Sequence, residues 1–308
     1  MLKITKNYME ANLITHGSKF HGDDVFSTAF MSLIIDNPVV CRVNNIDFSV
    51  GDDDVIIYDI GFGEFDHHQK EFDLRHDSGV KYASFGLLFK KYGMEYLNKI
   101  NPKYSSIVFS MVEHDLIEAI DAIDNGDFPV IDTSYNYKSL DSIIGDFNAC
   151  WNEDIDNDNC FMRAVVVAEM IFLSVVKKCF AKAEAKEIVE KAIDASSEHI
   201  MYLSEYMPFK DFVISSTNPK AQDILFCITP SNRGGYNVHT IPKDKNTHIT
   251  RCDLPSGWGG LCDKELQDVS GVESATFCHL SLFLGACGTL DDAYKMARIA
   301  IENMNNFE

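Results

Sequence analysis

Residues 55–69 read VIIYDIGFGEFDHHQ, and this stretch decides the fold. Its first four residues form an apolar, β-branched run that is typical of a strand buried in a parallel sheet. Polar residues follow at once, since Asp59 comes directly after the run and Asp66, His67 and His68 come after a glycine-containing turn. Ligands bind beside the carboxyl ends of strands in open α/β sheets, so we expect a functional site here.

A second group of polar residues follows an earlier strand in the same way. Residues 12–15 (NLIT) are predicted to form a strand, and the segment after them carries His16, His21, Asp23 and Asp24. A helix is predicted from residue 23 to about residue 35, because apolar residues recur on one face. Asp23 and Asp24 also suit the first turn of that helix, so one can cap it while the other binds a ligand.

The remaining pattern alternates strands with helices and then changes character. Strands are predicted at 39–43 and 275–279, a hairpin at 224–241 around SNRGG, and helices at 83–92, 105–123, 160–180, 181–206 and 290–303. This order predicts an α/β fold with an N-terminal parallel-sheet domain, a helical connector and a smaller C-terminal α/β domain. We expect the domains to be residues 1–206 and 207–308.

Composition limits the class of protein. The 308 residues include 47 Asp and Glu against 27 Lys and Arg, a formal net charge of −20. This charge argues against coating nucleic acid or an anionic membrane, although bound divalent cations would reverse its sign locally. Nine cysteines without a C-x-x-C pair, no signal or transit segment and no apolar run of membrane-spanning length predict a soluble, cytoplasmic protein with no membrane partner.

Imidazole and carboxylate ligands without thiolates favour Mn²⁺, Mg²⁺, Co²⁺ or Fe²⁺ over a structural zinc ion. Two metals about 3.5–4 Å apart need a bridging carboxylate, and Asp59 is the natural candidate. The ligand candidates are His16, His21, Asp23, Asp59, Asp66, His67 and His68. Four other histidines, taken singly, are expected to be surface residues: His76, His114, His199 and His248.

At Asp66-His67-His68 the chain resembles the DHH phosphoesterase superfamily, and within it the melanocyte-proliferating-gene family of metal-dependent hydrolases and exonucleases. Five ordered segments carry the resemblance over nearly the whole chain: THGSKFHGDD (15–24), DIGFGEFDHHQKEF (59–72), EAIDAIDNG (118–126), FNACWN (147–152) and the run 238–285. The resemblance implies a DHH-type N-terminal domain and a C-terminal substrate domain.

The resemblance also implies roles for individual residues. His16, His21 and Asp59 would hold one metal, and Asp23, Asp59, His67 and Asp121 the other, with Asp124 as the alternative to Asp121. Asp66 would orient a histidine and His68 would touch the scissile phosphate. Substrate would also meet three residues of the second domain: Arg251 on phosphate, Trp258 on a base or within the core, and His279 on an oxyanion. Two divalent cations are implied, Mn²⁺ first and Mg²⁺ or Co²⁺ as alternatives.

The activity implied by the resemblance is metal-dependent phosphodiester hydrolysis at a nucleic-acid end, as a 3′→5′ exonuclease on RNA or DNA. Cys262 replaces the family's arginine, and Leu280-Ser281-Leu282 replaces small residues, so the substrate class stays open. The alternatives are a phosphoesterase acting on a dinucleotide, a 3′-phosphonucleotide or pyrophosphate, and an inactive metal-binding interaction module. The sequence leaves the native metal and the oligomeric state open.

Overall fold

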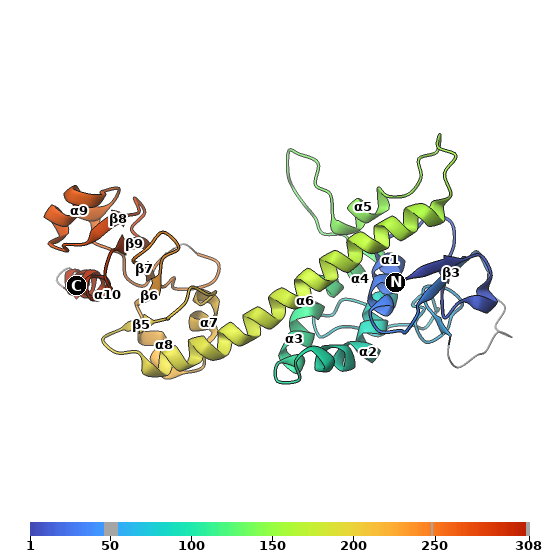
Figure 1. Ribbon diagram of the computed structural model, residues 1–308, viewed down its shortest axis with the longest axis horizontal. Coiled ribbons are helices and arrows are strands. Elements are labelled where there is room, and N and C mark those ends of the chain that lie inside the picture. Colours follow the sequence, from blue (N-terminus) through green and yellow to red (C-terminus); the bar gives the residue numbers. More distant parts are fainter. Residues whose placement is uncertain (46–54, 248, 306–308) are drawn as a thin grey trace. The chain divides into compact units, whose positions relative to one another are not determined.

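The computed structural model describes residues 1–45, 55–247 and 249–305, and the chain forms two compact units, Met1–Ala181 and Lys182–Glu308 (Figure 1). The two-domain α/β fold predicted from the sequence is confirmed. The division falls earlier than the expected boundary at 206/207. Residues 182–206 belong to the second unit because β5 (Ile200–Tyr202) pairs with β6 (Phe226–Pro230).

A four-stranded parallel sheet forms the centre of the first unit. Its order is β1-β3-β2-β4, with β1 at Lys3–Thr5, β3 at Val39–Val43, β2 at Leu13–His16 and β4 at Ile56–Ile57. All pairs run in the same direction, so the carboxyl ends of β2 and β4, which are neighbours, meet at one edge. This is the edge at which the two polar segments begin.

Helices pack around this sheet through aromatic side chains. They are α1 (Gly22–Ser32), α2 (Ser84–Ile100), α3 (Ser105–Val112), α4 (Glu118–Asp124), α5 (Leu140–Gly145) and the first part of α6 (Asn157–Ala195). Phe30, Phe85, Phe89 and Phe172 join α1, α2 and α6 in one buried cluster. The packing fixes the N-terminus of α1 against the sheet edge.

One π-helical turn, Glu113–Ile117, separates α3 from α4, where the sequence predicts an unbroken α-helix over 105–123. A π-turn contains one residue more than an α-turn, and it therefore changes which side chains of α4 face the sheet edge.

The predicted pair of helices at 160–180 and 181–206 is one continuous helix, α6, which ends at Ala195. No glycine or proline interrupts its 39 residues, and alanine, lysine and glutamate around residue 181 favour continuation. The prediction was wrong for 196–206, because Ile200–Tyr202 forms β5 instead of helix. Pairing with β6 determines the secondary structure of this segment, and the local propensity of its residues does not predict that pairing.

A five-stranded mixed sheet forms the second unit, in the order β5-β6-β7-β9-β8. The predicted hairpin is confirmed as β6 and β7 (Tyr236–Thr240), and the predicted strand as β8 (Ala275–Cys278) beside β9 (Leu284–Cys287). Helices α9 (Asp263–Ser270) and α10 (Leu290–Asn305) pack with a buried core on one face. The short helices α7 (Lys210–Ser215) and α8 (Pro219–Asp223) pack with the end of α6 on the other.

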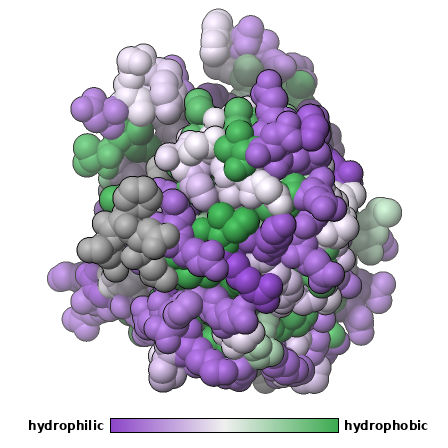
Figure 2. Space-filling model, turned by 90° about the vertical axis from the view of Figure 1, so that its left-hand side faces the viewer, coloured by the Kyte–Doolittle hydropathy of each residue, from purple (hydrophilic) through white to green (hydrophobic). Residues whose placement is uncertain are grey.

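The view in Figure 2 shows one face covered mostly by hydrophilic side chains, with smaller hydrophobic areas between them. Within the described residues, none of the helices combines the length and apolar character needed to cross a membrane. No disulfide joins any of the nine cysteines, all of which lie within the described ranges.

Candidate functional site

Polar side chains from both predicted segments converge at the carboxyl ends of β2 and β4. His16 is the last residue of β2, and Asp59 follows β4 and Tyr58. His21, Asp23 and Asp24 stand at the N-terminus of α1. Segment 66–68 and the last residue of α4, Asp124, complete the cluster.

The first part of the cluster is built on two imidazoles that face each other. The Nε2 atoms of His16 and His21 are 3.1 Å apart. Asp59 Oδ2 lies 3.2 Å from the first and 3.5 Å from the second. Asp24 Oδ2 lies 3.4 Å from His16 Nε2, so two carboxylates and two imidazoles converge on one small volume.

The second part shares Asp59 and adds Asp23, His67 and Asp124. Asp124 Oδ2 is 2.8 Å from His67 Nε2, and its Oδ1 is 3.0 Å from His21 Nδ1. One ligand atom from each of these four residues lies within 4.8 Å of the others. Asp59 also groups with Asp66, His67 and His68, which makes it common to three overlapping sets of ligand atoms.

The donor set fits a divalent cation. Both carboxylate oxygens of Asp59 and Oδ2 of Asp24 are buried and accept no hydrogen bond from any described residue. Burying carboxylate oxygens that accept no hydrogen bond is costly unless positive charge nearby, from an imidazolium or a metal ion, compensates them. Asp59 also has a positive φ of 56°, a conformation that is strained in a non-glycine residue and concentrated at functional sites. Histidine and carboxylate clusters of this kind are compatible with divalent metal binding.

Bound protons balance part of the negative charge of the carboxylates in the cluster. Burial lowers the pKa of His21, but Asp124, Asp24 and Asp59 outweigh this effect and raise it to about 10. Burial raises the pKa of Asp24 to about 6 despite the two nearby histidines. Burial, Asp124 and Asp59 also raise the pKa of Asp23. The cluster therefore holds positive charge on imidazole where the ligand atoms converge.

Backbone donors fix the carboxylates around the cluster. Asp23 accepts hydrogen bonds from the amides of Ser84 and Phe85 at the start of α2. Asp66 accepts from the amides of Phe62 and His68, and its Oδ1 lies 2.8 Å from His68 Nδ1. The His68 side chain is 55% exposed, so Asp66 fixes the ring while much of the side chain stays accessible to solvent.

The two aspartates of α4 have different partners in the structure. Asp121 is fully buried and bonds to His76 Nε2 at 2.8 Å and to the amide of Gly86 at 3.2 Å. Asp124, not Asp121, reaches the cluster. The physical reason is that Asp121 is already neutralised by His76, whose other ring nitrogen lies 3.1 Å from Glu113.

His76 is thus a buried structural residue, and its expected surface position was wrong. His114 and His199 are exposed as predicted, and His248 lies outside the described residues. Of the two aspartates expected at the start of α1, Asp24 caps the helix through Oδ1, which accepts from the amide of His21, while its second oxygen faces the cluster.

The three substrate candidates of the second unit have different surroundings. Arg251 donates through Nη1 to the carbonyls of Gln222 and Ile224 at the end of α8. Trp258 is 3% exposed within the core, so its ring is not open to a base. His279 is half-buried and accepts a hydrogen bond from the amide of Ser281.

Comparison with known proteins gives one family. Residues 12–301 match the sequence model of the MYG1_exonuc family, described as an uncharacterised protein family. A MYG1 protein of Caenorhabditis elegans is 32% identical, with 94% of each chain covered. The human MYG1 exonuclease is 26% identical, with 93% of this chain and 85% of the relative covered. A pGpG-specific phosphodiesterase from Vibrio cholerae aligns over 96% of this chain and 98% of its own, with 16% identity and a TM-score of 0.32.

Proposed function

This chain belongs to the MYG1 exonuclease family, and from that premise we propose that it hydrolyses phosphodiester bonds at nucleic-acid ends with two divalent cations. Membership makes the chain a phosphoester hydrolase. The finer proposal adds the metals, the residues that hold them and the polymer end as substrate. The observation that carries it is the pair of buried Asp59 oxygens, which accept no hydrogen bond from any described residue and lie where three ligand sets overlap.

We assign the ligands of each cation from the sets of side chains whose ligand atoms lie close together. His16, His21, Asp24 and Asp59 would hold one cation, and Asp23, Asp59, His67 and Asp124 the other. Such cations, when bound, lower the pKa of water and neutralise charge on phosphoryl oxygens. Mn²⁺ suits the mixed imidazole and carboxylate set, and Mg²⁺ or Co²⁺ would serve in its place.

Other residues of the chain hold the side chains of the proposed site in position. The backbone amides at the start of α2 hold Asp23 in place, and Asp66 holds the His68 ring by its Nδ1 side. The hydrogen bond from its ring to Asp66 raises the pKa of His68 and outweighs burial, which lowers it. A protonated His68, whose side chain is 55% exposed, would donate a hydrogen bond to a phosphate oxygen and stabilise the charge that develops there.

The test uses the full chain stripped of metal and reloaded with Mn²⁺. A chromogenic phosphodiester and an end-labelled RNA are the substrates, with Asp59→Asn as the variant. Loss of the shared ligand should lower kcat/KM by about 10³-fold, the scale of several kcal/mol of metal stabilisation. Asp36→Asn, an exposed carboxylate of the same unit, is the matched control and should leave kcat/KM unchanged.

Two results would reject the proposal: no metal-dependent hydrolysis of either substrate, or an Asp59→Asn enzyme as active as the wild type. A ladder of RNA lengths separates the polymer substrate from the small-molecule alternative. Release of successive nucleotides from one end is expected, whereas cleavage limited to dinucleotides would favour the small-molecule phosphoesterase.

A further inference from the structure

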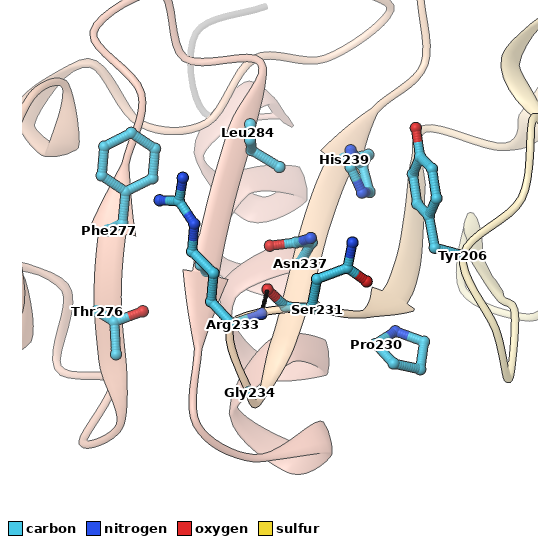
Figure 3. Close-up of a pocket in the computed structure, with 12 residues that line it drawn as sticks. Tyr206, Pro230, Ser231, Arg233, Gly234, Asn237, His239, Thr276, Phe277 and Leu284 are labelled. Carbon is cyan, nitrogen blue, oxygen red and sulfur yellow. Dashed lines mark hydrogen bonds between the residues drawn. The ribbon is translucent and has the colours of Figure 1, made fainter.

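Half of one sheet face in the second unit is uncovered. On the β5 and β6 side, α7, α8 and the end of α6 bury that face in a core that includes Phe209, Val213 and Cys227. The face continues across β7, β9 and β8, where it lines an open pocket of about 650 Å³ (Figure 3). The twelve residues that line this pocket are Tyr206, Pro230, Ser231, Asn232, Arg233, Gly234, Asn237, His239, Thr276, Phe277, Leu284 and Ala286.

Strand register explains why these side chains share the face. Asn237 pairs with Ala286 and His239 pairs with Leu284, while Val238 between them points into the opposite core. Phe277 pairs with Ala286 from the other side, after a bulge at the start of β8. The pocket floor is therefore a regular sheet surface and not a gap between loops.

The pocket is electrostatically unusual for this chain. The chain has a net charge of −20, yet none of the twelve residues that line the pocket is a carboxylate. Arg233 projects over the floor between Phe277 and Asn237 (Figure 3). Its guanidinium has no ion-pair partner among the described residues, whereas Arg42, Arg75 and Arg298 each pair with a carboxylate. A free guanidinium without competing carboxylates suits a phosphate group.

Aromatic rings stand on both sides of Arg233. Tyr206 is 61% exposed, and its ring centroid lies 6.2 Å from that of His239 on β7. Phe277 lies on β8, two strand spacings or about 10 Å from β7. A single base cannot stack on both rings, whereas two successive bases of one strand can.

We propose that this face binds a single-stranded oligonucleotide segment of at least two nucleotides, with bases on Tyr206 and Phe277 and the phosphate between them on Arg233. The inference rests on the proposed function, since it assigns a holding site for the same polymer. Asn237 and Ser231 supply side-chain donors and acceptors for the sugar or base edges. Burial lowers the pKa of His239 to about 4, so its ring stays neutral and adds no charge to the pocket near pH 7.

Binding is measured on the full chain in EDTA, where no turnover occurs, by fluorescence anisotropy of end-labelled RNA of one to eight nucleotides. Affinity should rise steeply from one to three nucleotides. Tyr206→Ala and Arg233→Ala should each weaken binding of the longer RNA about tenfold, and Arg233→Lys should restore part of the loss. Arg298→Ala, an exposed arginine of the same unit, is the control and should bind as wild type.

Hydrolysis of a chromogenic phosphodiester tests the metal cluster independently of this face. The pocket variants should keep wild-type activity on that small substrate while KM for RNA rises. Wild-type RNA affinity in both alanine variants, or equal affinity for one and eight nucleotides, would overturn the assignment. Length-dependent binding with no hydrolysis of any phosphodiester would uphold this face and reject the proposed function instead.

Discussion

Asp121 and Asp124 lie one helical turn apart, and replacing each by asparagine should have opposite consequences. Asp121 and His76 form a 2.8 Å ion pair whose side chains are both 0% exposed. Removing one partner of such a buried pair costs about 3–5 kcal/mol. In a unit of this size, each kcal/mol of lost stability lowers the Tm by about 2–4 °C. Asp121→Asn should therefore lower the Tm of the first unit by about 6–20 °C.

The metal response should separate the two variants. Mn²⁺ at 100 times its Kd stabilises a folded protein by about 2.7 kcal/mol, which corresponds to about 5–11 °C here. Asp121→Asn should keep this increase, because Asp121 faces His76 and the amide of Gly86. Asp124→Asn should lose most of it, because Asp124 faces His21 and His67 in the cluster.

Differential scanning calorimetry of the full chain, in EDTA and then with Mn²⁺, measures both quantities. Titration calorimetry of the wild type supplies the Kd that sets the metal concentration. The reasoning would be refuted if Asp121→Asn abolished the Mn²⁺ increment while Asp124→Asn retained it. That result would return Asp121 to the ligand position that the family resemblance first suggested.

Three further predictions concern single positions. Gly86→Ala should destabilise the first unit strongly in thermal unfolding, because its Cβ would lie 1.9 Å from Asp121 Oδ2. Burial and Lys210 hold the pKa of His239 at about 4, below its unfolded value, so the second unit should lose about 3 kcal/mol as pH falls from about 6.5 to 4. Denaturant unfolding of His239→Gln should lack that loss. Trp258→Ala should cost about 3–5 kcal/mol of second-unit stability by the same method, whereas Trp258→Phe should leave oligonucleotide affinity unchanged.

Local sequence patterns predict the strands and the hairpin well. Residues 39–43 and the segments around SNRGG carry their own β-branched and turn signals, and the structure matches them closely. The end of α6 differs, since no residue near 196 predicts that 200–202 pairs with β6. Contacts between distant segments decide such positions, and a single sequence does not display them.

The residues of the candidate site also fall into those that local motifs predict and those that contacts between distant segments determine. His16, His21, Asp59 and His67 follow strands in short motifs, and the structure brings them together. The choice between the two aspartates of α4 depends on the buried partner His76, which lies 45 residues away in sequence. The surroundings of Trp258 likewise depend on the core of the second unit, which a motif match does not reveal.

The π-turn at Glu113–Ile117 has a consequence for insertions and deletions in this chain. Each residue advances a helix by about 100° about its axis, since a turn holds 3.6 residues. Closing the π-turn to an α-turn with every residue kept would rotate α4 by that angle relative to α3, and Asp124 would leave the cluster. Deleting one residue from the turn would instead give an α-turn with α4 keeping its present face. Related chains that lack the π-turn should therefore be one residue shorter here and still place the aspartate in the cluster.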